Sequence, residues 1–344
     1  MALDLNTKKV IRNAYRITSK RPVTCLRIRV PGGHFAARHL AVVQRIAEEF
    51  GNGSVHITIR QGFEIPGIPF ERMPEVNRAL KTLIDEVEIA AGVEIEQREG
   101  GYPAAGTRNI SACIGNRVCQ FANYDTTALA KRLEREVFPN HYHVKIALTG
   151  CPNDCIKAHL QDFGIIGQAD VGLDPQRCVG CEACAKNCQL RVTGAITMRN
   201  NRAVRDPRRC IGCGECVLKC PTNAWTRNPQ KYYRLVIMGR TGKKNPRLAA
   251  TFIEWTTEEA IVAIIRNTYA FIDQHIDRSL PKEHVGYIVD RVGYQRFREA
   301  VLSGVELGAK AVVAENLLYA GYWYERDKAL IQGTGTTLSA GKSN

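Results

Sequence analysis

Two stretches decide the organisation of this chain: CVGCEACAKNC at residues 178–188 and CIGCGECVLKCP at residues 210–221. Each places four cysteines at the spacing C-x2-C-x2-C-x3-C, and the second is followed directly by Pro221. Such closely repeated thiols in a chain of 344 residues indicate metal binding, because disulfide frameworks are typical of small secreted domains. The two stretches form an internal repeat, so we expect residues 171–227 to be a separate cysteine-rich module.

The repeated spacing is that of bacterial ferredoxins that hold two [4Fe-4S] clusters. One loop supplies three thiolates to a cluster and the other motif supplies the fourth, because a single tight loop cannot surround the cluster. Two structural zinc sites are the alternative, but these usually show C-x2-C pairs separated by a longer gap. We therefore expect cluster one at Cys178, Cys181, Cys184 and Cys220, and cluster two at Cys210, Cys213, Cys216 and Cys188.

Four further cysteines form two pairs outside this module. Cys113 and Cys119 are separated by five residues, and Cys151 and Cys155 by three. Together they predict a third four-thiolate site, so three [4Fe-4S] clusters would use twelve of the 13 cysteines. Cys25 remains, and we expect it to be a buried or half-buried free thiol in a strand.

Around the second set of cysteines the sequence resembles the siroheme and [4Fe-4S] sulfite and nitrite reductases. The resemblance rests on TRNISAC (107–113) with Cys119, on LTGCPNDC (148–155), on ITIRQGFEIPGI (57–68) and on VIMGRTGKKNPRLA (236–249). It covers about residues 20–275. With the ferredoxin module inserted, the layout is most similar to the catalytic subunits of anaerobic, dissimilatory-type sulfite reductases.

The resemblance implies a sulfite reductase that transfers six electrons to sulfite and releases sulfide. It implies a siroheme next to the third cluster, with Cys155 as the ligand that serves both the cluster and the siroheme iron. The opposite face of the iron would stay open for the substrate, as at other catalytic metals.

Basic side chains in two expected strands are candidates for binding the anion. In residues 55–61, His56, Thr58 and Arg60 alternate with an apolar row, and residues 141–148 repeat this with His141, His143 and Lys145. Histidine titrates near neutrality and can donate protons, whereas the family more often has lysine at position 143. The resemblance assigns the substrate cage to Arg60, Arg108, His143 and Lys145.

Other basic residues are candidates for the acidic side chains of siroheme. Arginine binds carboxylates through two parallel hydrogen bonds, which makes it suited to such a cofactor. Arg27 and Arg29 alternate with apolar residues and are expected to face the cleft. The expected carboxylate partners in the closing loop are Arg240, Lys243, Lys244 and Arg247.

The order of strand and helix signals predicts an α+β protein. Strands are expected at residues 23–30, 55–61, 143–149 and 231–239, and helices at 34–50, 71–91, about 120–137, about 256–275 and about 282–303. Residues 1–100 are expected to form a ferredoxin-like half-domain. Residues 101–170 and 228–330 would form the siroheme/[4Fe-4S] domain, residues 171–227 the inserted two-cluster ferredoxin module, and residues 331–344 a flexible tail.

The formal net charge of +14 would suggest nucleic acid as a partner. Three clusters would contribute about −6 and an octa-carboxylate tetrapyrrole about −8, so we expect bound cofactors to balance the excess, with a generic solvated basic surface as the alternative. No basic and aromatic stripe or recognised nucleic-acid motif is present. No apolar run approaches the roughly 20 residues of a membrane span, and the first residues lack the apolar core of a secretory signal, so a cytoplasmic location is expected.

The source of electrons is expected to be another protein. The chain has no G-x-G-x-x-G fingerprint between a strand and a helix, and no flavin motif. The resemblance implies a flavin-containing subunit that oxidises NADH and a second iron–sulfur subunit. Alternatives remain open: a siroheme nitrite reductase shares the motifs, a non-catalytic iron–sulfur carrier would explain only the inserted module, and a nucleic-acid-binding iron–sulfur protein rests on charge alone.

Overall fold

The N-terminal unit is built on a four-stranded antiparallel sheet. The structure is a computed structural model, and it describes residues 14–20, 22–92, 109–138, 140, 142–242, 246–280 and 283–319. The strand order is β1-β2-β4-β3, and two helices pack on the sheet around a core that includes Leu26, Ile46, Ile65 and Leu80. The elements are β1 (Tyr15–Ile17), β2 (Val23–Ile28), η1 (Pro31–Gly33), α2 (His39–Glu49), β3 (His56–Ile57), β4 (Phe63–Pro69), η2 (Phe70–Arg72) and α3 (Met73–Ala91).

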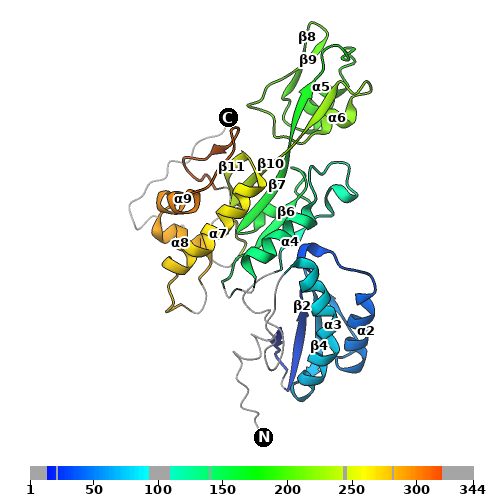
Figure 1. Ribbon diagram of the computed structural model, residues 1–344, viewed down its shortest axis with the longest axis vertical. Helices are drawn as coiled ribbons and strands as arrows, with labels where there is room; N and C mark the ends of the chain where they lie inside the picture. The colour runs from blue at the N-terminus through cyan, green and yellow to red at the C-terminus, as the bar shows by residue number, and fades with distance from the viewer. Residues whose placement is uncertain are drawn as a thin grey trace.

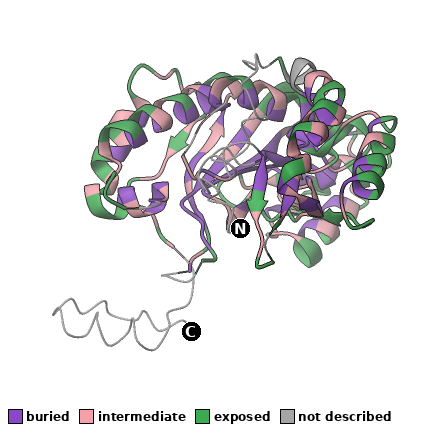
Figure 2. Cartoon of the chain, turned by 90° about the horizontal axis from the view of Figure 1, so that it is seen from below, coloured by how far each residue is buried: buried purple, intermediate pink, exposed green. Residues whose placement is uncertain are grey.

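A six-stranded mixed sheet forms the centre of the molecule, in the order β12-β11-β10-β7-β6-β5 (Figure 1). Strands β5, β6 and β7 run parallel, and β7, β10, β11 and β12 are antiparallel. Figure 2 shows buried residues concentrated along the strands. The elements are β5 (Ser111–Ala112), η3 (Gly115–Arg117), α4 (Thr126–Val137), β6 (Ile146–Thr149), η4 (Ala158–Leu160), β7 (Phe163–Leu173), β10 (Trp225–Ile237), β11 (Ala250–Thr256), α7 (Glu258–His275), α8 (Val285–Val292), α9 (Tyr294–Leu302) and β12 (Val312–Val313).

The cysteine-rich segment is carried by the two longest strands. β7 and β10 pair from Phe163 opposite Ile237 to Leu173 opposite Trp225, with one register shift after Arg227. The segment leaves the ladder at its far end and has its own small core (Figure 1). The expected boundaries at 171 and 227 fall on paired residues of this ladder. Its elements are α5 (Ala183–Arg191), β8 (Ile196–Arg199), β9 (Arg202–Arg205) and α6 (Glu215–Lys219).

The α+β class is confirmed, but one expected strand was wrong. Only His56 and Ile57 of residues 55–61 are strand, because residues 58–62 close a tight turn in which Thr58 Oγ1 accepts a bond from Gly62 N at 3.0 Å. Ile57 and Ile59, which belong to the apolar row of the expected strand, are 70% and 94% exposed. Alternating apolar residues therefore marked a hairpin end and not a buried strand.

Several helix limits also differ from expectation. α4 begins at Thr126 because Asp125 caps it, accepting bonds from Thr127 N and Ala128 N. The expected helix at 282–303 is broken by Gly293 at φ 101°, which separates α8 from α9. β7 and β11 were not predicted at all. No helix among the described residues is long and apolar enough to cross a membrane.

Candidate functional site

Two small cavities in the inserted segment are each lined by four cysteines. Each takes three cysteines from one motif and one from the other, which is the pairing that the sequence predicts. The remaining walls are largely apolar, with Leu173, Met198 and Trp225 around one cavity and Val171, Val192 and Ile196 around the other. The first is lined by Cys178, Cys181, Cys184 and Cys220, and the second by Cys188, Cys210, Cys213 and Cys216.

Helix α5 joins the two cavities. Cys184 and Cys188 are one helical turn apart on its buried side, and each lines a different cavity. Burial raises the pKa of the Cys216 thiol to about 12, with the neighbouring Cys213 and Cys210 adding to the shift. A thiol in such surroundings is protonated at neutral pH, and thiolate is the form that binds metal.

Donors point at the sulfur atoms in both cavities. The amide of Ala224 donates to Cys220 Sγ at 3.2 Å, and Arg205 Nη1 donates to Cys210 Sγ at 3.8 Å. The buried Trp225 Nε1 lies beside the Cys184 thiol and has no geometrically good partner among the described residues. Four thiolate ligands, an apolar shell and donors to sulfur are what an iron–sulfur cluster requires, so these residues fit that group.

The other four cysteines meet at one edge of the central sheet. Cys113 follows β5 and Cys151 follows β6, and these strands are parallel neighbours. Gly150 N donates to Cys113 Sγ at 3.1 Å. Burial raises the pKa of Cys151 to about 11, and the nearby thiols of Cys119, Cys155 and Cys113 add to it. Among the described residues no three His, Cys, Asp or Glu side chains are placed to hold a single metal ion.

Cys155 differs from its three companions because it is exposed, whereas Cys151 is buried. The loop between them is held by Asp154 at φ 46°, whose carboxylate accepts bonds from Ala158 N at 2.6 Å and contacts His159 Nδ1 at 2.7 Å. This arrangement leaves the Cys155 thiol at the rim of the site. It is therefore open to a second group, as the resemblance requires of the shared ligand.

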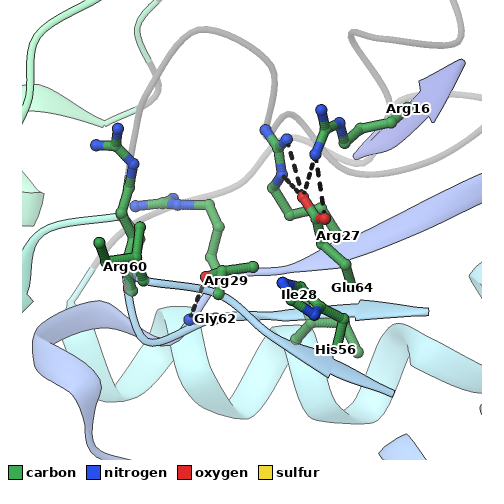
Figure 3. Close-up of a pocket in the computed structure, with 11 residues that line it drawn as sticks. Arg16, Arg27, Ile28, Arg29, His56, Arg60, Gly62 and Glu64 are labelled. Carbon is green, nitrogen blue, oxygen red and sulfur yellow. Dashed lines mark hydrogen bonds and ion pairs between the residues drawn. The ribbon is translucent and has the colours of Figure 1, made fainter. Parts of the chain in front are cut away.

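A cavity of about 360 Å³ lies in the N-terminal unit and is strongly cationic. Figure 3 shows Arg60 and Arg29 extending beside Arg27 and Arg16 along the same side of the sheet. Burial lowers the pKa of the Arg60 guanidinium, and Arg27 acts in the same direction while Asp162 opposes them. A poorly hydrated guanidinium of this kind favours an anion as its partner.

The turn that carries Arg60 is fastened to the cysteine site. Asn109 Nδ2 donates to Arg60 O at 2.6 Å. Gln61 bonds the backbone of Ala112 in both directions, with its amide nitrogen on Ala112 O and its amide oxygen on Ala112 N, each at 2.8 Å. Arg60 precedes Gln61 and Cys113 follows Ala112, so these two hydrogen bonds join the turn that carries Arg60 to the cysteine site.

Two of the expected siroheme partners are engaged elsewhere. Glu64 accepts bonds from Arg27 at 3.2 Å and from Arg16 at 2.8 Å (Figure 3). Arg29 forms an ion pair with Glu134 of α4, both side chains being buried, and its guanidinium lies 3.7 Å from the Phe138 ring centre. Arg29 lines the cavity, but its charge fastens β2 to the central domain.

Asp162 is a residue that sequence reasoning missed. It is 3% exposed and accepts a bond from Lys145 N at 2.9 Å. Burial raises its pKa to about 6, although Lys145, Arg60 and Arg240 act to lower it. Lys145 precedes β6, Asp162 precedes β7 and Arg240 follows the antiparallel β10, so all three lie at one edge of the sheet.

The edge of the sheet near Asp162 and the edge that carries the cysteines lie at opposite ends of β6. The four residues of β6 separate the two edges by about 13 Å. The sequence did hold one sign of Asp162, because this acid comes immediately before the buried apolar run FGII (163–166). Its meaning depended on the parallel pairing of β6 and β7, which the sequence reasoning did not predict.

Two of the expected carboxylate partners in the closing loop, Arg240 and Arg247, are bound to an acid of this chain. Arg240 and Arg247 both pair with Asp290 of α8 at 2.9 Å. Each guanidinium also lies over a ring, Arg240 over Tyr287 at 4.3 Å and Arg247 over Tyr319 at 3.7 Å. The two arginines are thus gathered at one place, with Asp290 where a cofactor carboxylate is expected.

His143 pairs in a short bridge with His284, the two ring centres being 5.5 Å apart. Cys25 is a buried free thiol in β2. The remaining predicted residues, Arg108, Lys243, Lys244 and the tail 331–344, lie outside the described residues, as does His141.

Comparisons with known proteins agree with this geometry. Residues 104–310 match the nitrite and sulphite reductase 4Fe-4S domain, and residues 19–83 match the nitrite/sulfite reductase ferredoxin-like half domain. The chain is 44% identical to one of the subunits of the anaerobic sulfite reductase of Salmonella typhimurium, over 94% of this chain and 96% of that protein.

Solved structures share the fold. The structure described as dissimilatory sulfite reductase I matches with a TM-score of 0.65 at 16% identity, over 94% of this chain and 76% of that one. Mycobacterium tuberculosis NirA matches with a TM-score of 0.55 at 15% identity, over 86% and 45%. The two domain matches and the near full-length relative show that the chain belongs to the nitrite and sulfite reductase family.

Proposed function

We propose that this chain is the catalytic subunit of a sulfite reductase, which carries out the six-electron reduction of sulfite to sulfide. The observation that supports the proposal is the contact between Gln61 and Ala112, because it joins the turn that carries Arg60 of the cationic cavity to the strand that precedes Cys113. The relative from Salmonella typhimurium, matched over nearly its whole length, is named as part of an anaerobic sulfite reductase.

Siroheme, when bound, supplies an iron with an open coordination position beside an electron-donating cluster. The residues here fit that group: Cys155 is exposed beside three companion thiols, and cations surround Asp162 at the opposite edge of the sheet. Cys155 would supply the shared thiolate. The carboxylates of siroheme would be held by Arg240, Lys243, Lys244 and Arg247. Arg27 and Arg29 would join them once their ion pairs with Glu64 and Glu134 open.

The anion cage would bind sulfite and supply protons. Arg60 and Arg108 would hold the sulfite oxygens with donors that stay charged at any working pH. Lys145 and His143 would deliver the protons with which each oxygen leaves as water. Such donors help most when they stabilise charge that develops during the reaction, more than the bound substrate.

Electrons would enter through the inserted clusters from partner subunits, which we expect to be a flavin-containing NADH-oxidising subunit and an iron–sulfur subunit. Asn123 indicates the inner end of this route. Its backbone N–H donates to Gly150 O at 2.7 Å and its side chain to Gly212 O at 3.4 Å, so it joins the neighbour of Cys151 to the neighbour of Cys213. Cluster two would therefore face the third cluster, and cluster one would be the outer of the two.

Cofactor analysis tests the proposal directly. Anaerobically purified protein should contain about twelve cluster irons and one further iron in an extractable tetrapyrrole. Turnover with reduced methyl viologen should yield sulfide from sulfite, and parallel assays with nitrite would identify a nitrite reductase. About eight irons without tetrapyrrole would instead identify an electron carrier and contradict the proposal.

A further inference from the structure

The surface of the inserted segment is markedly basic. Residues 171–227 contain ten Lys and Arg against four Asp and Glu. Glu182 is the only acid among these that is exposed, and it is paired with Lys186 at 3.2 Å. Two clusters with charges of about −2 each would leave the segment positive. The exposed cations are Arg177, Lys186, Arg191, Arg199, Arg202, Arg208, Arg209 and Lys219.

Helix α5 presents an apolar residue among these cations. Its buried side holds Cys184 and Cys188, its opposite side exposes Lys186 and Leu190, and Arg191 is exposed at its last residue. Leu190 is 85% exposed, and Val179 in the preceding cysteine loop is 68% exposed. A helix is about 10 Å across, so about this thickness separates a molecule on the outer side of α5 from the cysteines on its buried side.

The position of this surface suits the entry of electrons. Asn123 of the central domain contacts Gly212, the residue before Cys213, so cluster two would lie nearer this domain than cluster one. The segment itself lies at the end of the molecule opposite the N-terminal unit (Figure 1). Cys181 of cluster one is exposed, and Val179 belongs to the wall of the same cavity. The outer surface of α5 together with Val179 forms the entry face.

We propose that the entry face is the docking surface for an acidic redox protein that delivers electrons to cluster one. Opposite charge accelerates encounter and orients the partner, while the exposed side chains of Leu190 and Val179 each offer a small apolar contact. This proposal deepens the proposed function, because it assumes that the inserted segment holds its clusters.

The test uses the full holoprotein and a reduced acidic [2Fe-2S] ferredoxin as the probe. Stopped-flow absorbance would follow reduction of the inserted clusters at several ionic strengths. Lys186→Glu with Arg191→Glu should lower the second-order rate at least tenfold at low salt and flatten its salt dependence. Leu190→Ser should lower the rate while keeping the salt dependence.

The matched control is Arg45→Glu with Arg78→Glu, which changes the net charge equally on exposed helix positions of the N-terminal unit. It should leave the rate within about twofold. An equal loss in both double variants would overturn the proposal, since only net charge would then matter. An unchanged ferredoxin rate in the α5 variant, with loss of binding to duplex DNA, would identify a nucleic-acid surface instead.

Sulfite turnover with reduced methyl viologen separates this proposal from the proposed function. The small donor needs no protein docking surface, so the α5 double variant should retain wild-type turnover with it. Absence of sulfite turnover in the wild type would contradict the catalytic function, while cluster reduction by the ferredoxin would still report on the entry face. Loss of viologen-driven turnover in the α5 variant alone would show damage to the clusters and overturn the docking role.

Discussion

The inserted cysteine segment and the cationic cavity are built in opposite ways. In the segment, each ligand set comes from two short motifs that lie within 43 residues of sequence, and the motif spacing already states the pairing. The cavity and its surroundings draw on β2, the turn after β3, Asn109 and the strand ends near Asp162. Local spacing thus predicts the cysteine groups of the inserted segment, whereas the cationic cavity is assembled only by the tertiary fold.

The largest effect should come from Cys155, which belongs to neither region and which we propose as the ligand shared by the siroheme and its cluster. Cys155→Ser should abolish siroheme binding and sulfite turnover, because in the proposed site one sulfur serves both metal groups. Cys184→Ser is the matched control, since it should damage one inserted cluster and leave siroheme bound. Visible spectra with iron and sulfide analysis would check both. A native siroheme spectrum and full turnover in Cys155→Ser would show that the shared ligand lies elsewhere.

The cavity should be the next most sensitive region. Arg60→Ala should reduce sulfite turnover per bound siroheme by about 10²–10³, the usual effect of removing one donor to a developing oxyanion. Arg16→Ala, at the exposed rim of the same cavity, should have little effect. Steady-state assays with reduced methyl viologen would compare them. Equal turnover in the two variants would place the substrate site outside this cavity.

Asp162 tests whether the edge opposite the cysteines is electrostatically tuned. Its folded pKa is raised from 3.8 to about 6, so between these values the folded state binds a proton that the unfolded state has lost. Stability from this group therefore falls as pH rises from about 4 to 6, by up to about 3 kcal/mol.

Asp162→Asn keeps an oxygen for Lys145 N and removes the titration. Relative to wild type, the variant should gain stability progressively across this pH window. Denaturant unfolding of the cofactor-free protein at pH 4 to 7 would measure the difference. A difference that stays constant with pH would contradict the raised pKa.

The smallest effect is expected at Asp290, the acid that holds Arg240 and Arg247. Asp290→Asn should lower the stability of the cofactor-free protein by about 1 kcal/mol, because the carboxylate is partly exposed and solvent screens the pair. It should also raise siroheme affinity several-fold, since the arginines become available. Thermal unfolding and siroheme titration would report the two changes. Weaker siroheme binding would mean that Asp290 positions the arginines and does not compete for them.

The sequence predicted well where chemistry is encoded by spacing. The α+β class, helix α3, helix α7 and the grouping of cysteines around each cavity all follow from residues close in the chain. The expected strand at 55–61 failed because a hairpin end also alternates apolar and polar residues, and Gln61 at φ 63° turns the chain there.

Ion-pair partners that are distant in the chain could not be predicted from the sequence, for a physical reason. An arginine in a sequence carries the same charge whether it awaits a ligand or is paired, and only the fold brings Glu134 to Arg29 or Asp290 to Arg240. Asp162 was missed for the same reason, since its neighbours lie 17, 78 and 102 positions away in the chain.

The ladder between β7 and β10 has a consequence for how such a chain arises. Leu173 and Trp225 are paired neighbours, so the two ends of the inserted segment lie about one strand spacing, roughly 5 Å, apart. A short hairpin turn closes the same gap. An insertion at that turn can therefore add the whole cysteine-rich segment without changing the pairing of β7 with β10, and excision of the segment is the reverse change.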